Sequence, residues 1–247
     1  MSMLTRIAAR SACVLSLAAL FAREVSAQES AAFDEYRVEI TLAHPISGRF
    51  AGEPFVRFDD QTVATKVFRV EFPSVIYRAT RWLQGLSGMN VIWNQVEEPG
   101  SSTRELRPYV GVKVSVPNSA HVRLYDLSRF EWRRITNADT DSVTREVRFR
   151  TRPSVEFPLS SRAWQPGTFY GLANVETLVE HGFIDELRFA SGAGHVTRDR
   201  MRIEVQYVAY LTRGSPSQAL AYSRSSFRLN VKFSFAEGLL HLLNDSE

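Results

Sequence analysis

Three arginines with period-two spacing are the residues of this sequence best suited to bind a ligand. Arg148, Arg150 and Arg152 alternate with other residues, so an extended strand would put their guanidinium groups on one face. Each guanidinium offers forked donors to carboxylate, sulfate or phosphate, and this face could therefore bind an anion. The competing interpretation is an ordinary solvated face that Glu146 partly neutralises.

Two tryptophans could add an aromatic surface to such a site. Trp132 lies in an arginine-rich stretch and Trp164 in a polar loop, so both are candidates for exposure. Flat indoles stack against sugar rings, although a loop tryptophan usually folds back over the edge of a core. Trp82 and Trp93 are expected in the core instead. The candidate ligand-binding set is Trp132, Trp164, Arg148, Arg150 and Arg152, for an anionic glycan or a protein partner.

The motifs of common catalytic and cofactor sites are missing from the sequence. It has no nucleophile elbow, H-E-x-x-H motif, phosphate-binding loop or dinucleotide fingerprint, and its five histidines lack metal-ligand spacing. Asn137, Asp139 and Asp141 have the spacing of half a calcium loop, but Ser142 and Arg148 replace the required glycine and glutamate. We therefore expect no catalytic residue, no metal and no cofactor.

One five-residue segment resembles a known family. Residues 103–107 (TRELR) resemble the R-[ST]-E-L-R strand of jelly-roll alginate lyases, which would imply arginines that hold a uronate carboxylate. The family's Gln-x-His strand and its Tyr-Phe-Lys-Ala-Gly-x-Tyr strand, which carries the catalytic tyrosine, are missing from the chain. The resemblance therefore assigns no catalytic residue here.

Residues 1–27 have the features of an export signal. Arg6 and Arg10 precede an apolar run over residues 12–22, and small residues before and at Ala27 offer a cleavage site. The run is too short to cross a bilayer as a helix, so we expect no transmembrane span. The signal predicts a periplasmic or secreted protein. A mitochondrial transit peptide is the alternative, because the leader carries Arg and Ser and few acids.

Charge and cysteine content narrow the function further. The chain has 30 basic and 27 acidic residues, and the leader takes three arginines and one glutamate, which leaves 27 against 26. A nearly neutral mature chain gives no support for binding nucleic acid. Cys13, the single cysteine, lies in the leader, so no disulfide is expected. Residues 28–247 are long enough to bury a full core without one, as a single domain.

Hydrophobic alternation predicts an all-β fold. Residues 201–211 and 227–235 alternate apolar with polar side chains, the pattern of strands with one buried face. About ten such strands, with frequent turn signals, favour an antiparallel two-sheet sandwich that is jelly-roll-like. Spacing of three and four predicts a short helix at residues 74–84. A cap at Asn174 and a stop at Gly182 favour a second at residues 174–181, and the apolar tail at residues 236–243 is a third candidate.

An outer-membrane β-barrel would also combine an export signal with long alternating strands. Three observations count against it. Most predicted strands are shorter than ten residues, prolines and helical interruptions are frequent, and the chain ends on polar residues rather than on a strand. The sandwich is therefore preferred.

Three functional hypotheses follow. The first is an exported, non-catalytic β-sandwich for binding or assembly, which recognises an anionic glycan or partner through Arg and Trp side chains. The second is a jelly-roll carbohydrate-active enzyme, a polysaccharide lyase or glycoside hydrolase, with paired carboxylates across a concave face. The third is a structural subunit of an envelope or organellar complex, in which the apolar tail at residues 239–243 docks on a partner.

Overall fold

The computed structural model describes residues 34–61, 65–96, 102–117, 121–159, 164–198, 201–215 and 217–236. All of them belong to one compact unit, Phe33–Glu247. The expected export signal at residues 1–27 lies outside the described residues. So does the expected helix at residues 236–243, apart from Ala236, which ends the last strand.

The described residues form strands joined by turns and loops. The strands are β1 (Glu35–Ser47), β2 (Phe50–Gly52), β3 (Phe55–Gln61), β4 (Thr65–Arg78), β5 (Leu83–Val96), β6 (Thr103–Val116), β7 (Arg123–Asn137), β8 (Val143–Pro158), β9 (Phe169–Glu180), β10 (Phe183–Arg198), β11 (Met201–Thr212) and β12 (Ala221–Ala236).

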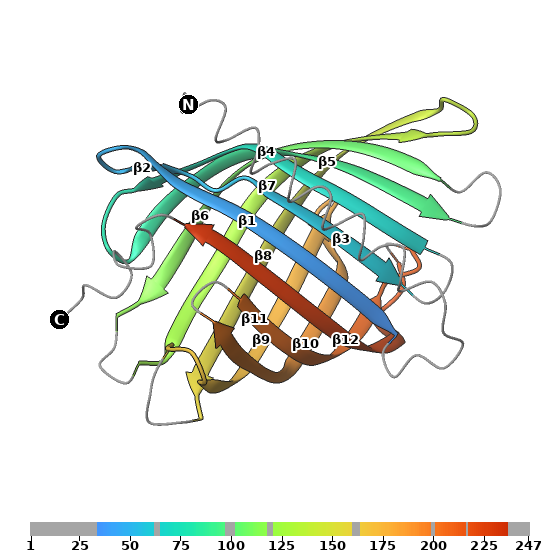
Figure 1. Cartoon of the computed structure of the whole chain (residues 1–247). Coiled ribbons are helices and arrows are strands. Elements are labelled where there is room, and N and C mark those ends of the chain that lie inside the picture. The colour runs from blue at the N-terminus through green and yellow to red at the C-terminus, as the bar shows by residue number, and fades with distance from the viewer. Residues whose placement is uncertain are drawn as a thin grey trace. The chain divides into compact units, whose positions relative to one another are not determined.

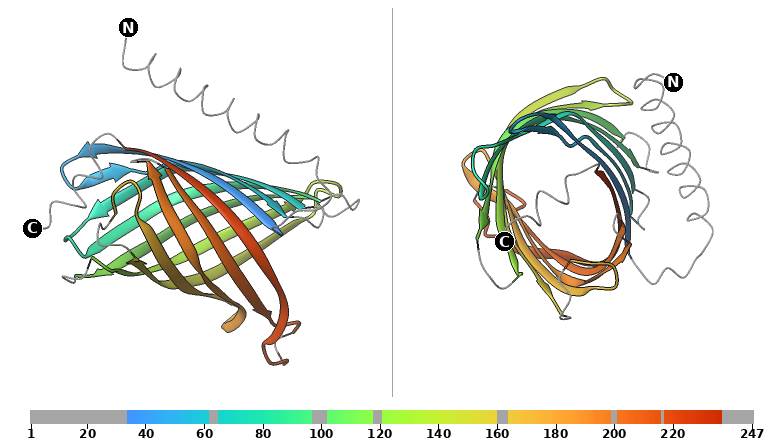
Figure 2. Two further views of the ribbon diagram at one scale, coloured as in Figure 1. Left: turned by 60° about the horizontal axis from the view of Figure 1, so that its bottom comes forward. Right: turned by 60° about the vertical axis from the view of Figure 1, so that its left-hand side comes forward.

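The strands close into a β-barrel. Neighbours from β4 to β12 pair antiparallel in chain order, and β2 and β3 share one position between β1 and β4, so the wall has 11 strands. β1 and β12 pair parallel from Glu35↔Arg228 to Ala43↔Ala236 and close the ring. The two strands lie side by side in Figure 1, and Figure 2 (right) shows the ring of strands. The prediction of a two-sheet sandwich, jelly-roll-like, with short helices is therefore wrong.

The alternation was real, but the faces were assigned the wrong way round. In β6, Glu105, Arg107 and Tyr109 are buried and point into the lumen, the space that the wall encloses. Leu106 and Val110 alternate with them and are exposed on the outside. Among the described residues, sixteen buried residues are polar or charged and thirteen are hydrophobic. Period-two patterning cannot say which face is the wet one, and here the polar face is the inner one.

Strand length was underestimated because prolines were taken to end strands. Pro73 lies at a bulge in β4, where the register with β5 shifts between Glu71 and Ser74. Pro108 of β6 and Pro153 of β8 each leave a short gap on one side of the ladder, after which pairing resumes in the same register. A proline removes one donor from one ladder. The remaining pairs carry the strand past it.

Two predicted helices and two predicted core residues are also corrected. Residues 74–84 form the end of β4, a turn and the start of β5, and residues 174–180 complete β9, where β-branched Val and Thr favour a strand. Trp82 and Trp93 lie on the outer surface, 43% and 38% exposed. Both errors have one cause, because the apolar positions of this chain face out of the barrel.

Three buried tyrosines tie together strands that are two positions apart in the wall, inside the lumen. Tyr170 of β9 reaches across Gly194 of β10 and donates its hydroxyl to Glu204 of β11, at 2.8 Å. Tyr109 of β6 reaches across Gly88 of β5 in the same way and donates to Glu71 of β4, at 2.6 Å. A third bridge runs from Tyr210 to Glu35, at 2.8 Å. The glycines make room for the rings, since a side chain there would occupy the ring's place.

Gly194→Ala is expected to destabilise the barrel by about 1–3 kcal/mol, the usual cost of overpacking. A Cβ at this position would lie 2.3 Å from Cζ of Tyr170, which is fully buried and cannot move aside. Gly85→Ala is the matched control, because a Cβ there meets nothing within 4 Å. Urea unfolding of the two variants measures the difference. Equal midpoints would show that the tyrosine bridge does not depend on the glycine.

Candidate functional site: the charged lumen

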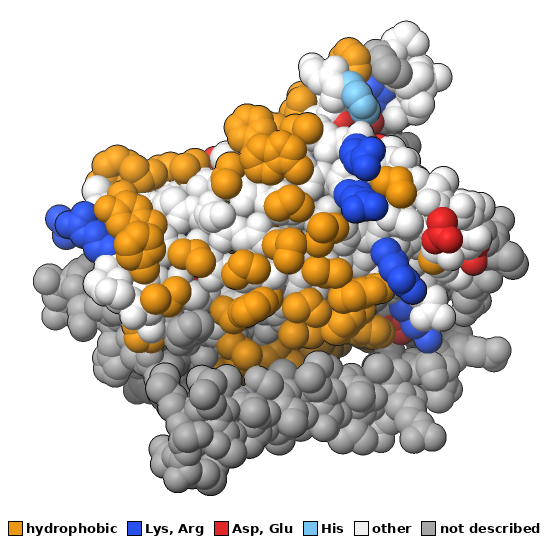
Figure 3. Space-filling model, turned by 90° about the horizontal axis from the view of Figure 1, so that it is seen from above, with side chains coloured by type: hydrophobic (Ala, Val, Ile, Leu, Met, Phe, Trp, Pro, Cys, Tyr) orange, Lys and Arg blue, Asp and Glu red, His pale blue; other side chains and the backbone are white. Residues whose placement is uncertain are grey.

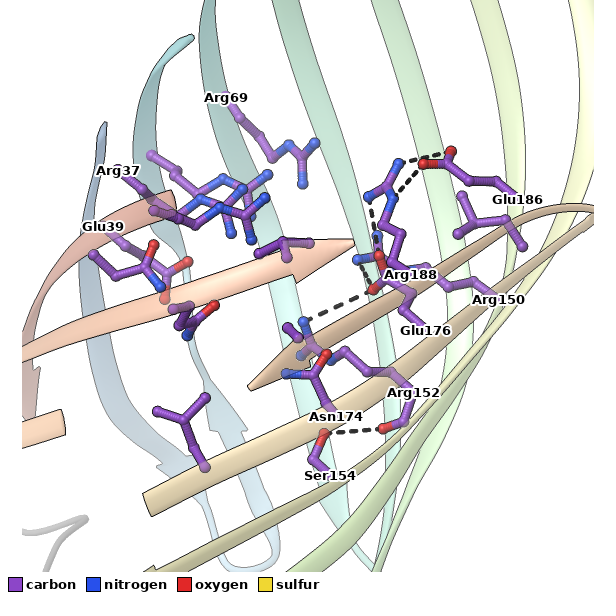
Figure 4. Close-up of a pocket in the computed structure, with 18 of the residues that line it drawn as sticks. Arg37, Glu39, Arg69, Arg150, Arg152, Ser154, Asn174, Glu176, Glu186 and Arg188 are labelled. Carbon is purple, nitrogen blue, oxygen red and sulfur yellow. Dashed lines mark hydrogen bonds and ion pairs between the residues drawn. The ribbon is translucent and has the colours of Figure 1, made fainter. Parts of the chain in front are cut away.

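The barrel encloses a cavity of about 450 Å³, a size usual for small-molecule sites. Its lining is dominated by charged side chains, which point inward from most strands of the wall (Figure 4). The basic residues of the lining are Arg37, Arg57, Arg69, Arg107, Arg133, Arg148, Arg150, Arg152, Arg188, Arg228 and Lys232. The acidic residues are Glu39, Glu105, Glu156, Glu176, Glu180, Asp185, Glu186 and Glu204.

Glu131 of β7 is the centre of an ion-pair network on one side of the lumen. Its side chain is completely buried and is approached by arginines from three strands. Arg129 and Arg148 are each 2.5 Å from a carboxylate oxygen, and Arg107 and Arg150 are at 3.6 and 3.7 Å. A buried carboxylate is tolerated only when it is paired, and four guanidinium groups meet that need.

The network extends from Glu131 across β6 to β10. Arg150 also pairs with Glu176, which Arg188 contacts at 3.0 Å. Arg133 bridges Glu105 and Glu180, at 2.7 Å from each. Most of these contacts join adjacent strands, and the one between Arg133 of β7 and Glu180 of β9 reaches past β8, so the side chains link five consecutive strands of the wall. We call this set the ion-pair network.

A second group, the arginine cluster, consists of Arg37, Arg57 and Arg69 on β1, β3 and β4. Asp59 pairs with Arg37, and its other oxygen is 3.0 Å from Nε of Arg57. Arg69 has no carboxylate of the described residues within 4 Å, and its Nε is buried without a hydrogen-bond partner. Figure 4 shows Arg37 and Arg69 pointing into the cavity opposite Arg150 and Arg188. One aspartate therefore faces three arginines.

The structure places the predicted ligand-binding residues in three different environments. Arg148, Arg150 and Arg152 share one face of β8, as predicted, and that face lines the lumen. Their neighbours are Glu131 and Glu176 from the flanking strands, whereas the sequence suggested Glu146. Trp132 is 46% exposed on the outside of the wall and does not join them.

Trp164 lies over one end of the lumen. Its ring stacks on Arg123 at 3.6 Å and packs against Tyr170, and its Nε1 donates to the carbonyl of His121 at 2.7 Å. Glu156 holds Arg123 and Arg202, at 3.6 and 3.7 Å. Trp164 therefore folds back from its loop, as the competing interpretation expected, and shares no contact with Trp132.

Most residues of the lumen were missed by sequence reasoning. Glu131 and Glu176 were missed because each strand was considered without its neighbours. The arginine cluster was missed because only the apolar positions of its strands were interpreted. One signal was available. In β6, β8, β10 and β11 the polar register carries both acids and bases, a mixture that a face in contact with water does not need.

Two smaller predictions can be placed as well. Asn137 begins the β7–β8 turn, where its Oδ1 accepts hydrogen bonds from the amides of Asp139 and Thr140, so this segment is a polar hairpin turn. Within the described ranges, no group of three or more His, Cys, Asp or Glu side chains is placed to hold a metal ion. The segment that resembles alginate lyases opens β6, and its Glu105 and Arg107 belong to the ion-pair network.

The outer wall is apolar. Figure 3 shows one face, with hydrophobic side chains gathered along it and charged ones toward its ends. Large exposed hydrophobic residues occur on nearly every strand, among them Phe50, Phe72, Val112, Phe130, Val147, Phe157, Phe189, Tyr207 and Phe227. Soluble monomers rarely expose so much contiguous apolar surface. In the part of the chain that the structure describes, no helix is long and apolar enough to cross a membrane.

Fold and site together define the class: a closed β-barrel with a charged lumen and an apolar outer wall. The chain belongs to the family described as "Protein of unknown function (DUF2490)", whose model matches residues 31–219. The match takes in the strands from β1 to β11. No curated protein matches the chain.

Proposed function

We propose that this protein is a membrane-spanning β-barrel of an outer membrane, with a narrow lumen that admits small ions and prefers anions. The observation that carries the proposal is the inversion of polarity between the two faces of the wall. A barrel that faces lipid needs apolar side chains outside and satisfied polar groups inside, which is the arrangement found here. The predicted export signal agrees with a protein that leaves the cytoplasm before it inserts.

The height of the apolar band supports this proposal. Exposed aromatic residues mark both ends of the wall: Phe50, Tyr77, Trp82, Phe157, Phe169 and Phe235 at one end, and Trp93 and Tyr222 at the other. Trp82 lies in the turn just before β5, and Trp93 lies eleven positions further, near the other end of that strand. At about 3.4 Å per residue and a tilt of about 40°, they are separated by about 28 Å along the axis. This is close to the hydrocarbon thickness of a bilayer.

The charge of the lining supports the preference for anions. Eleven basic and eight acidic residues line the cavity, which leaves an excess of three positive charges. Rings of Arg and Lys are how pores favour anions, since fixed charge in a low-dielectric channel attracts counter-ions. This retains the anion recognition expected of Arg148, Arg150 and Arg152, and moves it from an outer face to a lumen.

A non-conducting barrel is the second candidate, and the ion-pair network favours it. Arg133 and Glu131 tie together side chains of β6 to β9 along one side of the interior. Barrels of this size can be filled by their own side chains. In that case the protein would hold a ligand in the cavity without passing it through the membrane.

Planar-bilayer recording of the purified, folded protein tests the proposal. In a KCl gradient we expect channels whose reversal potential shows chloride to be the more permeant ion. Membrane fractionation should find the protein in the outer membrane. Recovery in the soluble periplasmic fraction would contradict the spanning barrel. A membrane-inserted protein without conductance would favour the second candidate.

Arg152→Glu is expected to shift the selectivity toward cations. Arg152 lines the cavity and is held only loosely, with its Nη1 3.9 Å from Glu176. Reversing its charge therefore changes the net charge of the lumen by two units without breaking a close ion pair. Arg145→Glu is the control, because Arg145 is exposed on the outward register of the same strand. The reversal potential in a KCl gradient measures both, and an identical shift in the two variants would exclude a lumen effect.

A further inference from the structure

We propose that the arginine cluster of Arg37, Arg57 and Arg69 is a binding site for a doubly charged oxyanion, with inorganic phosphate as its simplest ligand. The inference rests on the proposed function in that it names the anion that the lumen accepts. Its site is on the β1–β4 side of the lumen, apart from the ion-pair network.

Two arginines of the cluster are held close together by the sheet. Arg57 and Arg69 are directly opposite each other in the β3–β4 ladder, and both line the cavity. Like charges in such positions destabilise a sheet unless a counter-ion lies between them. Asp59 is the carboxylate in ion-pair contact with the cluster among the described residues, and it serves Arg37 and Arg57.

Two guanidinium donors of the cluster are unsatisfied. The Nε atoms of Arg57 and Arg69 are buried and have no hydrogen-bond partner. Nε of Arg57 is 3.0 Å from a carboxylate oxygen of Asp59, but the two groups are not oriented to form a hydrogen bond. Buried guanidinium donors are normally satisfied, so these two add to the unbalanced positive charge on this side of the lumen.

The charges around Arg69 are mostly positive. The charges that act on it most strongly are those of Arg57, Arg107, Asp59 and Arg150, and three of these four are positive. Glu39 lies beside the cluster in the cavity lining and makes no ion pair within 4 Å among the described residues. Asp59 and Glu39, which is directly opposite Arg57 in the β1–β3 ladder, leave one positive charge of the cluster unbalanced, and Arg107 and Arg150 add to the positive field at Arg69.

The chemistry of the donors selects the ligand class. Forked guanidinium groups match the oxygens of phosphate or sulfate, and several of them can bind one tetrahedral anion at once. Chloride has one charge and accepts no bidentate pair. A site built from several arginines should therefore prefer an oxyanion over chloride at equal ionic strength.

Titration calorimetry tests the site, with the barrel folded in detergent and a phosphate-free buffer. The probes are inorganic phosphate, sulfate and chloride. We expect phosphate to bind with one site per barrel and to raise the unfolding midpoint, since a ligand that binds only the folded state stabilises it. Arg69→Gln should weaken phosphate binding about tenfold to a hundredfold, the usual effect of losing a charge-assisted hydrogen bond. Arg145→Gln, with the same charge change on the outer face, should leave the affinity unchanged.

A second variant changes the affinity in the opposite direction. Asp59→Asn removes the carboxylate that competes with the ligand for Arg37 and Arg57, so phosphate should bind more tightly. A purely structural role for the cluster would predict weaker binding, or none, in both variants. Phosphate binding no tighter than that of chloride, or an unchanged affinity in Arg69→Gln, would overturn the site.

The calorimetric result does not depend on conductance. If the barrel conducts chloride but fails to bind phosphate, the site is wrong and the channel stands. If it binds phosphate but carries no current, the site stands and the channel is wrong. A hexose phosphate as a further probe separates the two sources of the group: binding of the ester as well as of free phosphate extends the site to phosphorylated solutes.

Discussion

Val110→Arg is expected to prevent stable insertion of the barrel into a bilayer. Val110 is 45% exposed on the outer wall, near the middle of β6, where the proposed membrane is most apolar. An arginine that faces lipid at the midplane costs about 2–4 kcal/mol, and the cost falls to about 0–1 kcal/mol near the interface. The free energy of unfolding from phospholipid vesicles, measured in urea, should fall by the larger amount.

Val116→Arg is the matched control for this experiment. Val116 is 53% exposed on the outward register of the same strand, at its end. The proposed membrane predicts a large loss at position 110 and a small one at position 116. If the outer wall faced water, an arginine at either exposed position would be tolerated equally. Equal and small effects would therefore refute the membrane-spanning barrel.

The strands can be predicted from the sequence, but their closure into a barrel cannot. Alternation correctly located most of the wall, including β11 and β12, because side-chain period depends only on local backbone geometry. Closure depends on the pairing of Glu35 with Arg228, which are far apart in the chain and belong to strands of equal pattern. No local rule selects that partner, and a sandwich and a barrel share the same periodicity.

The candidate site was partly predictable for a related reason. The shared face of Arg148, Arg150 and Arg152 follows from spacing alone, and the structure has it. The neighbours of this face depend on which strands pair with β8. β7 and β9 do so, and they bring Glu131 and Glu176 beside the arginines. The arginine cluster depends on three strands meeting at one level, so no single stretch of sequence contains it.

One further sequence feature could have decided between the two folds. Exposed tryptophans and valines on one register, with acids and bases on the other, make poor sense for a soluble sheet. In the core of a two-sheet sandwich, Glu105 and Arg107 would be buried against apolar side chains, and each charge would need its own partner there. Placing them together in one lumen lets the strands neutralise one another. The polar register therefore carries the information about architecture that the apolar register lacks.

Glu131→Gln is expected to prevent the barrel from folding or to lower its free energy of unfolding by about 3–5 kcal/mol, the cost of breaking a buried ion pair from one side. The side chain keeps its shape, but Arg129 and Arg148 lose the carboxylate 2.5 Å away, and Arg107 and Arg150 lose the charge that offsets their mutual repulsion. Urea unfolding measures the loss.

Glu39→Gln is the control for Glu131→Gln, since Glu39 lines the same lumen and makes no ion pair within 4 Å among the described residues. It should change the free energy of unfolding by much less. The double variant Glu131→Gln with Arg129→Gln should recover part of the loss, because removing both partners leaves one fewer unpaired charge. If Glu131→Gln were no worse than Glu39→Gln, the ion-pair network would not hold the lumen together. Its arginines would then be as free to meet an anion as those of the arginine cluster.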